Sequence, residues 1–460
     1  MEKKNTWETY SSKQLKELEK INAQYRDFLD NGKTERECID TIVNTIEKSG
    51  YRELESLIKE GTALKTGDKV YSVWMNKSIA MFQIGRKPMT EGMNILGAHI
   101  DSPRLDVKQN PLYEDGGFAY LDTHYYGGVK KYQWVTIPLA IHGVIVKKDG
   151  TCVEINIGEN EDDPVFFVSD LLIHLAQEQL EKKAAKVIEG EALDIIVGNK
   201  PLLIDKKDKK KDEKEAGKEA VKAGVLDILK ETYDIHEEDF VSAELEIVPA
   251  GKAREAGFDR SMILAYGQDD RVCAYTSMQA MLDSDVTDRT MCCILVDKEE
   301  IGSVGATGMQ SHFFENAVAE VMNLTGEYSE LHVRRCLAHS CMLSSDVSSA
   351  FDPTYASSFD KKNVAYLGGG MVINKFTGAR GKSGSNDAYA EYLAHLRHIF
   401  DKAEVNFQTA ELGKVDLGGG GTIAYILALY GMNVIDSGVA VLNMHAPWEA
   451  TSKADVYETY

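Results

Sequence analysis

An apolar run that stops abruptly at charged residues and glycines constrains the fold of this chain more than any other stretch. The whole stretch, with the charged residues and glycines that follow the apolar run, spans Cys292 to Gly305 and reads Cys-Cys-Ile-Leu-Val-Asp-Lys-Glu-Glu-Ile-Gly-Ser-Val-Gly. Its apolar part is long enough for a buried strand, which must end before Glu299 and Glu300. Because side chains on successive residues diverge, one of these carboxylates can bind a metal ion while the other faces a bound water. The alternative for an isolated Glu-Glu pair is a solvated acidic turn.

Length and composition narrow the class of protein. A chain of 460 residues is too long for one ordinary core, so two domains are expected. A formal net charge of -21 argues against a nucleic-acid or anionic-membrane surface, since phosphate contacts need clustered Lys and Arg. The first residues lack the apolar core of a signal peptide, and no later segment is apolar over the length that a bilayer requires. We therefore expect a cytoplasmic protein that binds neither membrane nor nucleic acid.

A change in the pattern of apolar residues divides the chain into two kinds of segment. Residues 1–102 and 250–460 alternate apolar runs with amphipathic stretches, as an α/β domain does. Residues 103–249 are dominated by short β-rich runs, which predicts an inserted β-rich second domain. Within this insert, the spacing predicts a helix over 169–183 that carries His174. The mixed-charge run 206–222 has almost no apolar residues and predicts a mobile surface loop.

Five side chains of metal-binding type fall at or just beyond predicted strand ends of the α/β part. They are His99, Asp270, Glu300, Asp346 and His445. In open α/β sheets, ligands gather beyond the carboxyl ends of the strands, so these residues can converge. Imidazoles and carboxylates are ligands that zinc accepts, whereas the seven scattered cysteines include no Cys-x-x-Cys pair and indicate buried free thiols. Two histidines and three carboxylates are most simply divided between two metal ions that share one bridging carboxylate.

Such a pair of ions would activate water. Ions roughly 3.5–4 Å apart would hold a water or hydroxide between them, and metal binding can lower the pKa of water from about 16 to about 7. Glu299 would take the proton of that water and pass it to a leaving amine. Each residue also has a structural explanation when it is taken singly, since a lone His99 on a strand is commonly a core residue. Ser303 and Cys292 show no base partner, so nucleophilic catalysis is the weaker alternative.

Four motifs contain most of these residues. They are Gly97-Ala-His-Ile-Asp-Ser-Pro-Arg104, Asp297-Lys-Glu-Glu-Ile-Gly-Ser303, Ser345-Asp-Val-Ser348 and Met444-His445. Through them the chain resembles the aspartyl aminopeptidase family of dinuclear zinc aminopeptidases, as a bacterial member, in the family's order and across nearly the whole sequence. The resemblance implies an α/β metallopeptidase domain with a mixed sheet, interrupted by a β-rich dimerisation domain. It also implies that dimers assemble into a tetrahedral dodecamer that encloses the active sites.

The resemblance also implies which residues hold metal. His99 and Asp346 would hold one ion, Glu300 and His445 would hold the other, and Asp270 would bridge them. Two divalent ions per subunit are therefore expected, with Zn²⁺ favoured and Co²⁺ or Mn²⁺ as alternatives.

Further roles follow from the same resemblance. Glu299 would be the general base, and Asp101 would be a carboxylate that orients His99. His174 would reach the substrate in a neighbouring subunit's site, although the pattern alone indicates a histidine on a helix face. The chain departs from better-known members at Arg271, where they have Asn after the bridging Asp, and at 418–421, where glycines replace a Cys-Gly-Thr-Thr-like run.

The expected function is hydrolysis of the N-terminal residue of peptides by a metal-dependent aminopeptidase. A preference for acidic N-terminal residues is part of what the family implies, and the loop from Lys375 to Lys382, with Arg380, contains candidate partners for an acidic side chain. Two alternatives remain open. One is a dinuclear amidohydrolase or deacylase that acts on small molecules, and the other is a non-catalytic oligomeric shell protein.

Overall fold

The computed structural model describes residues 5–202, 219–378 and 380–460, and the chain divides into two compact units. The first unit contains Met1–Ser102, Ala253–Met444 and Trp448–Tyr460, and the second contains Pro103–Lys252 and His445–Pro447. The insert predicted from the sequence spans 103–249, whereas the second unit runs from Pro103 to Lys252 and also contains His445–Pro447. The dimerisation role expected for it stays a prediction.

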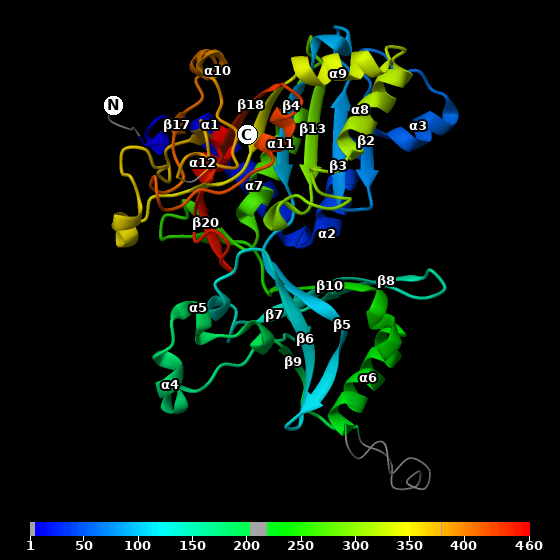
Figure 1. Ribbon diagram of the computed structural model, residues 1–460, viewed down its shortest axis with the longest axis vertical. Coiled ribbons are helices and arrows are strands. Elements are labelled where there is room, and N and C mark those ends of the chain that lie inside the picture. The colour runs from blue at the N-terminus through cyan, green and yellow to red at the C-terminus, as the bar shows by residue number, and fades with distance from the viewer. Residues whose placement is uncertain (1–4, 203–218, 379) are drawn as a thin grey trace. The chain divides into compact units, whose positions relative to one another are not determined.

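The first unit is built on a nine-stranded mixed sheet (Figure 1). In spatial order its strands are β1 (Arg52–Glu53), β2 (Lys69–Trp74), β3 (Ser78–Gln83), β13 (Met291–Val296), β4 (Asn94–His99), β14 (Cys341–Ser345), β18 (Asn433–Gly438), β16 (Met371–Asn374) and β17 (Phe407–Thr409). Strands β13, β4, β14 and β18 pair in parallel, so their carboxyl ends meet at one edge of the sheet. The α/β fold class with a mixed sheet, as expected from the sequence, is confirmed.

The interior strand β13 shows why this part of the chain must be buried on both faces. Cys292, Ile294 and Val296 pack into one hydrophobic core, whereas Cys293 and Leu295 pack into another. Alternate residues of a strand point to opposite faces, so a continuous apolar run suits a sheet that is covered on both sides. Helices that contribute to the first core are α3 (Leu54–Glu60), α8 (Phe313–Leu324), α9 (Glu330–His339) and α11 (Ala424–Ala428). Those that contribute to the second are α1 (Ser12–Asn31), α2 (Glu35–Lys48), α7 (Gln268–Leu282) and α12 (Lys453–Thr459).

A five-stranded sheet completes the first unit. Its strands in spatial order are β11 (Arg254–Ala256), β12 (Met262–Ala265), β20 (Glu449–Ser452), β19 (Ala440–Leu442) and β15 (Ser348–Ser349). Helix α10 (Ala390–Ala403) packs with the edge of the large sheet through Tyr392, Leu396 and Phe400.

The second unit contains a six-stranded antiparallel sheet. Its strands in spatial order are β8 (Cys152–Ile157), β7 (Leu139–Val146), β10 (Ala243–Pro249), β5 (Arg104–Asp115), β6 (Phe118–Tyr126) and β9 (Ile195–Gly198). Figure 1 shows β5 and β6 as the long hairpin of this unit. The helices are α4 (Gln177–Leu180), α5 (Ala184–Val187) and α6 (Ala220–Tyr233).

The sequence predicts a helix over 169–183 and a loop over 206–222 in the second unit. The helix expected over 169–183 is wrong, because this stretch forms only the 3₁₀ turn Ile173–Leu175 and the short α4. A longer helix would need to bury an apolar face, but Leu172, Ile173 and Leu175 are 54%, 67% and 68% exposed in the chain. The loop expected over 206–222 lies outside the described residues up to position 218, and its last residues, 220–222, begin α6.

In the part of the chain that the structure covers, none of the helices combines the length and the apolar character needed to cross a bilayer.

Candidate metal centre

The carboxyl-terminal edge of the parallel strands gathers most of the residues singled out from the sequence. His99 is the last residue of β4, Asp346 follows β14, and Glu299 and Glu300 follow β13. Since β13, β4 and β14 are parallel neighbours, their ends deliver these side chains to one place.

Asp269 lies at the centre of this cluster. One ligand atom from each of His99, Asp269 and Asp346 lies within 4.8 Å of the other two. A carboxylate oxygen of Glu300 also lies within 4.8 Å of Asp269. The Asp269 carboxylate therefore stands between the residues expected for one metal ion and the carboxylate expected for the other.

The sequence prediction that Asp270 is the bridging carboxylate is not what the geometry supports. Asp270 is fully buried but is not a member of the ligand cluster, whereas the preceding residue, Asp269, lies at its centre. The sequence reads Asp269-Asp270, and adjacent side chains point in different directions, so a prediction from the sequence alone is easily displaced by one residue. With this correction the residue that follows the central carboxylate is Asp270, not Arg271.

Asp101 contacts both His99 and the turn that carries Glu299 and Glu300. Its backbone oxygen lies 3.0 Å from Nδ1 of His99, and its carboxylate oxygen Oδ1 lies 3.3 Å from the same nitrogen. The backbone N–H groups of Glu299 and Glu300 each donate to one oxygen of the Asp101 carboxylate, at 3.1 Å. Asp101 thus holds His99 and the Glu-Glu turn in one arrangement, a link between distant segments that the sequence does not reveal.

The two glutamates occupy a single tight turn. Lys298 and Gly302, on either side of the 3₁₀ turn Glu299–Ile301, adopt left-handed backbone conformations with φ of 72° and 95°. Within the turn the two side chains diverge. Glu299 places Oε2 3.8 Å from Nε2 of His99, and its side chain is 14% exposed.

The electrostatics of the cluster suit a cation. Burial lowers the pKa of His99, but hydrogen bonding to Asp101 and Asp269 outweighs it, and the pKa lies above its ordinary value. Burial, followed by the negative charge of Asp270, raises the pKa of the Asp346 carboxyl. Crowded buried acids of this kind are costly without a counter-charge, and a divalent ion would reverse these pKa shifts. The donor set of one imidazole and several carboxylates fits zinc.

Two predicted histidines lie in the second unit. His445 belongs to the short segment His445–Pro447, and its Nδ1 lies 3.0 Å from the backbone oxygen of Gly128. His174 lies in the exposed 3₁₀ turn Ile173–Leu175. The roles expected for both histidines stay predictions.

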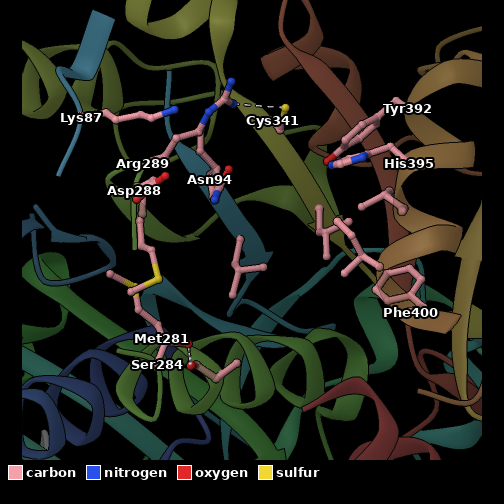
Figure 2. Close-up of a pocket in the computed structure, with 18 residues that line it drawn as sticks. Lys87, Asn94, Met281, Ser284, Asp288, Arg289, Cys341, Tyr392, His395 and Phe400 are labelled. Atoms are coloured by element: carbon pink, nitrogen blue, oxygen red, sulfur yellow. Dashed lines mark hydrogen bonds between the residues drawn. The ribbon is translucent and has the colours of Figure 1, made fainter. Parts of the chain in front are cut away.

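A hollow with a volume of about 620 Å³ lies at the opposite edge of the same sheet. Figure 2 shows Asn94 and Arg289 on one side of it, Tyr392 and His395 of α10 on the other, and Met281 of α7 below. It opens at the amino-terminal ends of β4, β13 and β14, whereas the acidic cluster lies at their carboxyl ends. Because chemistry in such sheets gathers at the carboxyl ends, this hollow is not the candidate active site.

Comparison with known proteins agrees with the geometry. The family model of the aminopeptidase I zinc metalloproteases (M18) matches residues 28–460. A probable M18 family aminopeptidase 1 from Clostridium acetobutylicum is 63% identical over 458 residues, which cover 100% of this chain and 96% of that protein.

Solved structures of similar proteins have the same fold. The crystal structure of an M18 family aminopeptidase from Thermotoga maritima has a TM-score of 0.92 at 44% identity, and the match covers 100% of this chain and 98% of that chain. A more distant structure, the mApe1 dodecamer of S. cerevisiae, has a TM-score of 0.75 at 20% identity and shares the fold, over 95% of each chain.

Proposed function

Because the chain belongs to the M18 family of aminopeptidase I zinc metalloproteases, we propose that it removes single residues from the amino terminus of peptides. The observation that carries this proposal is the gathering of His99, Asp346 and Glu300 around Asp269 at one edge of the sheet. The resemblance first noted in the motifs, and the enzyme class that it implied, are confirmed at the level of the family.

The proposed assignment of metal ligands uses the corrected bridge. His99 and Asp346 would hold one divalent ion, Glu300 and His445 would hold the second, and Asp269 would contact both. Zn²⁺ is the expected ion, and two ions per chain are part of the proposal. When bound, such ions supply Lewis acidity, which polarises the scissile carbonyl group and makes water more acidic.

The chain's own residues would handle the proton. The Glu299 carboxylate would accept a proton from the attacking water and deliver it to the nitrogen of the leaving amine. Its partly exposed position beside His99 leaves it accessible to substrate, in contrast to the fully buried Asp101. Asp101 would hold the His99 ring and the Glu299–Ile301 turn in the relative position that this transfer needs.

A preference for N-terminal Asp or Glu is the finer part of the proposal. Lys375 and Lys382 are the cations that support it, and both form ion pairs with Asp387. An acidic substrate side chain would have to share these cations with Asp387 or displace it.

We also propose that dimers of this chain assemble into a tetrahedral dodecamer in the cytoplasm. The distant mApe1 structure is a dodecamer. In this chain seven apolar side chains between residues 165 and 180 are exposed, and they are here called the 165–180 surface. Its residues are Val165, Phe167, Leu171, Leu172, Ile173, Leu175 and Leu180. Apolar side chains that stay exposed together in one short segment are candidates for an interface between proteins. His174 lies within it and would reach a neighbouring subunit's site.

The proposed function is tested with a panel of short peptides that differ only at the first residue, each with a free or an N-acetylated amino terminus. We expect the Zn²⁺- or Co²⁺-loaded enzyme to cleave only the free-amine peptides, with the fastest turnover for N-terminal Asp and Glu. Faster cleavage of the acetylated forms would identify a deacylase instead. A folded, metal-loaded protein that cleaves no member of the panel would support the non-catalytic shell.

A further inference from the structure

The backbone of Asp269 is held from both sides by buried polar side chains. Its N–H group donates to Oε2 of Glu449 at 2.9 Å, and its carbonyl oxygen accepts from the hydroxyl of Ser102 at 2.6 Å. Glu449 is 1% exposed and Ser102 is fully buried. Neither residue belongs to the ligand cluster around Asp269, and the two lie in segments far apart in the sequence.

The residue before Asp269 is fixed by the same strand. The side-chain amide of Gln268 donates to the backbone oxygen of Glu449 at 2.6 Å and to that of Ile263 at 3.2 Å. The hydroxyl of Tyr25 in α1 donates to the amide oxygen of Gln268 at 3.2 Å. Glu449 therefore contacts two consecutive residues of the turn, one through its backbone and one through its carboxylate.

A buried carboxylate such as that of Glu449 destabilises the fold by several kcal/mol unless strong hydrogen bonds offset the loss of its hydration. A hydrogen bond from a backbone N–H to a carboxylate is charge-assisted and roughly twice as strong as a neutral one. At Glu449 this bond ends on the residue whose own carboxylate stands between the two expected ions. A shift of that backbone would move the shared ligand relative to both ions at once.

We propose that Glu449 is a positioning residue that sets the Asp269 carboxylate for two metal ions through its hydrogen bond to the Asp269 backbone. The inference rests on the proposed function, since it assumes that Asp269 binds metal. Residues that orient metal ligands without touching the metal typically change affinity or activity by 10–100-fold when they are removed.

The test measures metal affinity, not only activity. The full-length chain is freed of metal and titrated with Co²⁺, whose visible absorption reports the geometry of its ligands, in competition with a chelator. Glu449→Ala removes the hydrogen-bond acceptor, and we expect its affinity for Co²⁺ to fall by about 10–100-fold with a changed absorption spectrum. Glu449→Gln keeps an oxygen that can accept the same N–H, so its affinity and spectrum should lie closer to those of the wild type.

A matched control separates positioning from general damage to the strand. Thr451 lies two residues further along β20, on the same face, and its hydroxyl donates to the backbone oxygen of Ala440. Thr451→Val removes this buried hydrogen bond without touching the Asp269 turn, and it should leave the Co²⁺ affinity unchanged. Thermal unfolding of the metal-free variants shows whether each one folds.

The outcomes distinguish this inference from the proposed function. Wild-type chain that binds no Co²⁺ would overturn both. Wild-type chain that binds two Co²⁺ ions, together with a folded Glu449→Ala variant of unchanged affinity and spectrum, would overturn the positioning role alone. A folded Glu449→Gln variant as weak as Glu449→Ala would also overturn it, since the acceptor would then be present without effect.

Discussion

At the scale of single residues, Glu299 and Glu300 differ in what their carboxylates face. Glu300 lies within 4.8 Å of Asp269, whereas Glu299 approaches the outer nitrogen of the His99 ring. Glu299→Gln should therefore lower turnover by at least about 100-fold, because the amide cannot accept a proton, while metal content stays near that of the wild type. Steady-state kinetics and metal analysis on the same sample check this. Activity close to that of the wild type would rule out Glu299 as the base.

The choice between Asp269 and Asp270 is a second prediction at this scale. Asp269→Asn should weaken binding of divalent ions by more than about 100-fold, since it alters the carboxylate that both proposed ions would share. Asp270→Asn should change affinity by less than about tenfold, because Asp270 lies outside the ligand cluster. Titration of the two metal-free variants with Zn²⁺ gives the comparison. The reverse order of effects would restore Asp270 as the bridge.

The sequence identified most of the cluster because each residue follows an apolar run that must be a strand. His99, Glu300 and Asp346 are of this kind, and all three lie beside Asp269. The sequence could not decide between two adjacent aspartates, since the local backbone determines which side chain turns inward. It also gave no sign of Glu449, whose contact with Asp269 joins positions 180 residues apart.

At the scale of elements, the turn between β12 and α7 depends on Gly267. This residue has φ of +70°, and a Cβ built there would lie 2.0 Å from Nη1 of Arg271. Arg271 cannot easily move, because it is buried and donates hydrogen bonds to the backbone oxygens of Ile100 and Lys33. Gly267→Ala should therefore be destabilised by both the backbone strain and the steric clash.

A matched variant isolates the steric clash at Gly267. Gly61, which ends α3, has φ of +66°, and a Cβ there meets nothing within 4 Å. We expect Gly61→Ala to lose about 1–2 kcal/mol of unfolding free energy and Gly267→Ala to lose at least about 2 kcal/mol more. Urea denaturation of the metal-free proteins measures both losses. Equal losses would show that the turn can relax around the added methyl group.

The start of α12 should make stability depend on pH. Burial raises the pKa of Asp455 to about 8, although the backbone N–H groups of Gly368 and Gly370 donate to its carboxylate. In the unfolded chain this carboxyl loses its proton near pH 4, so between about pH 4 and pH 8 only the folded state retains the proton. The contribution of Asp455 to stability therefore decreases as pH rises through this range, by up to about 1.4 kcal/mol per pH unit.

Asp455→Asn removes this ionisable group. The variant is expected to be less stable at pH 5, because an amide nitrogen cannot accept one of the two backbone hydrogen bonds. Its loss of stability between pH 5 and pH 8 should nevertheless be smaller than that of the wild type. Urea midpoints of the metal-free proteins at both pH values, at one protein concentration, test this. An equal loss in both proteins would mean that Asp455 is already ionised in the folded state.

Elements were predictable where burial on both faces leaves a continuous apolar run, as in β13. They were not predictable where an apolar segment lacks a core within its own chain. The residues from 169 to 183 have the apolar content of a helix, yet Leu172 and Leu175 stay exposed and only one short helix forms. Periodicity reports which face of a segment is apolar, but it does not report whether this chain or another covers that face.

At the scale of the whole molecule, the 165–180 surface leads to a prediction about assembly. The double variant Leu172→Glu, Leu175→Glu should lower the molar mass measured by light scattering, because it places charges where apolar area would be buried between subunits. Lys182→Glu, in the same part of the chain and half-exposed, changes charge without removing apolar area and is the control. Unchanged mass in the double variant would place the interface elsewhere.

Asp269 is proposed to bridge two metal ions at the carboxyl edge of the sheet. Crystals of the chain soaked with Zn²⁺ test it most directly, through the anomalous difference density recorded at the zinc absorption edge. We expect two peaks roughly 3.5–4 Å apart, with one carboxylate oxygen of Asp269 directed to each. A single peak, or two peaks bridged by Asp270 with Asp269 turned away, would contradict it.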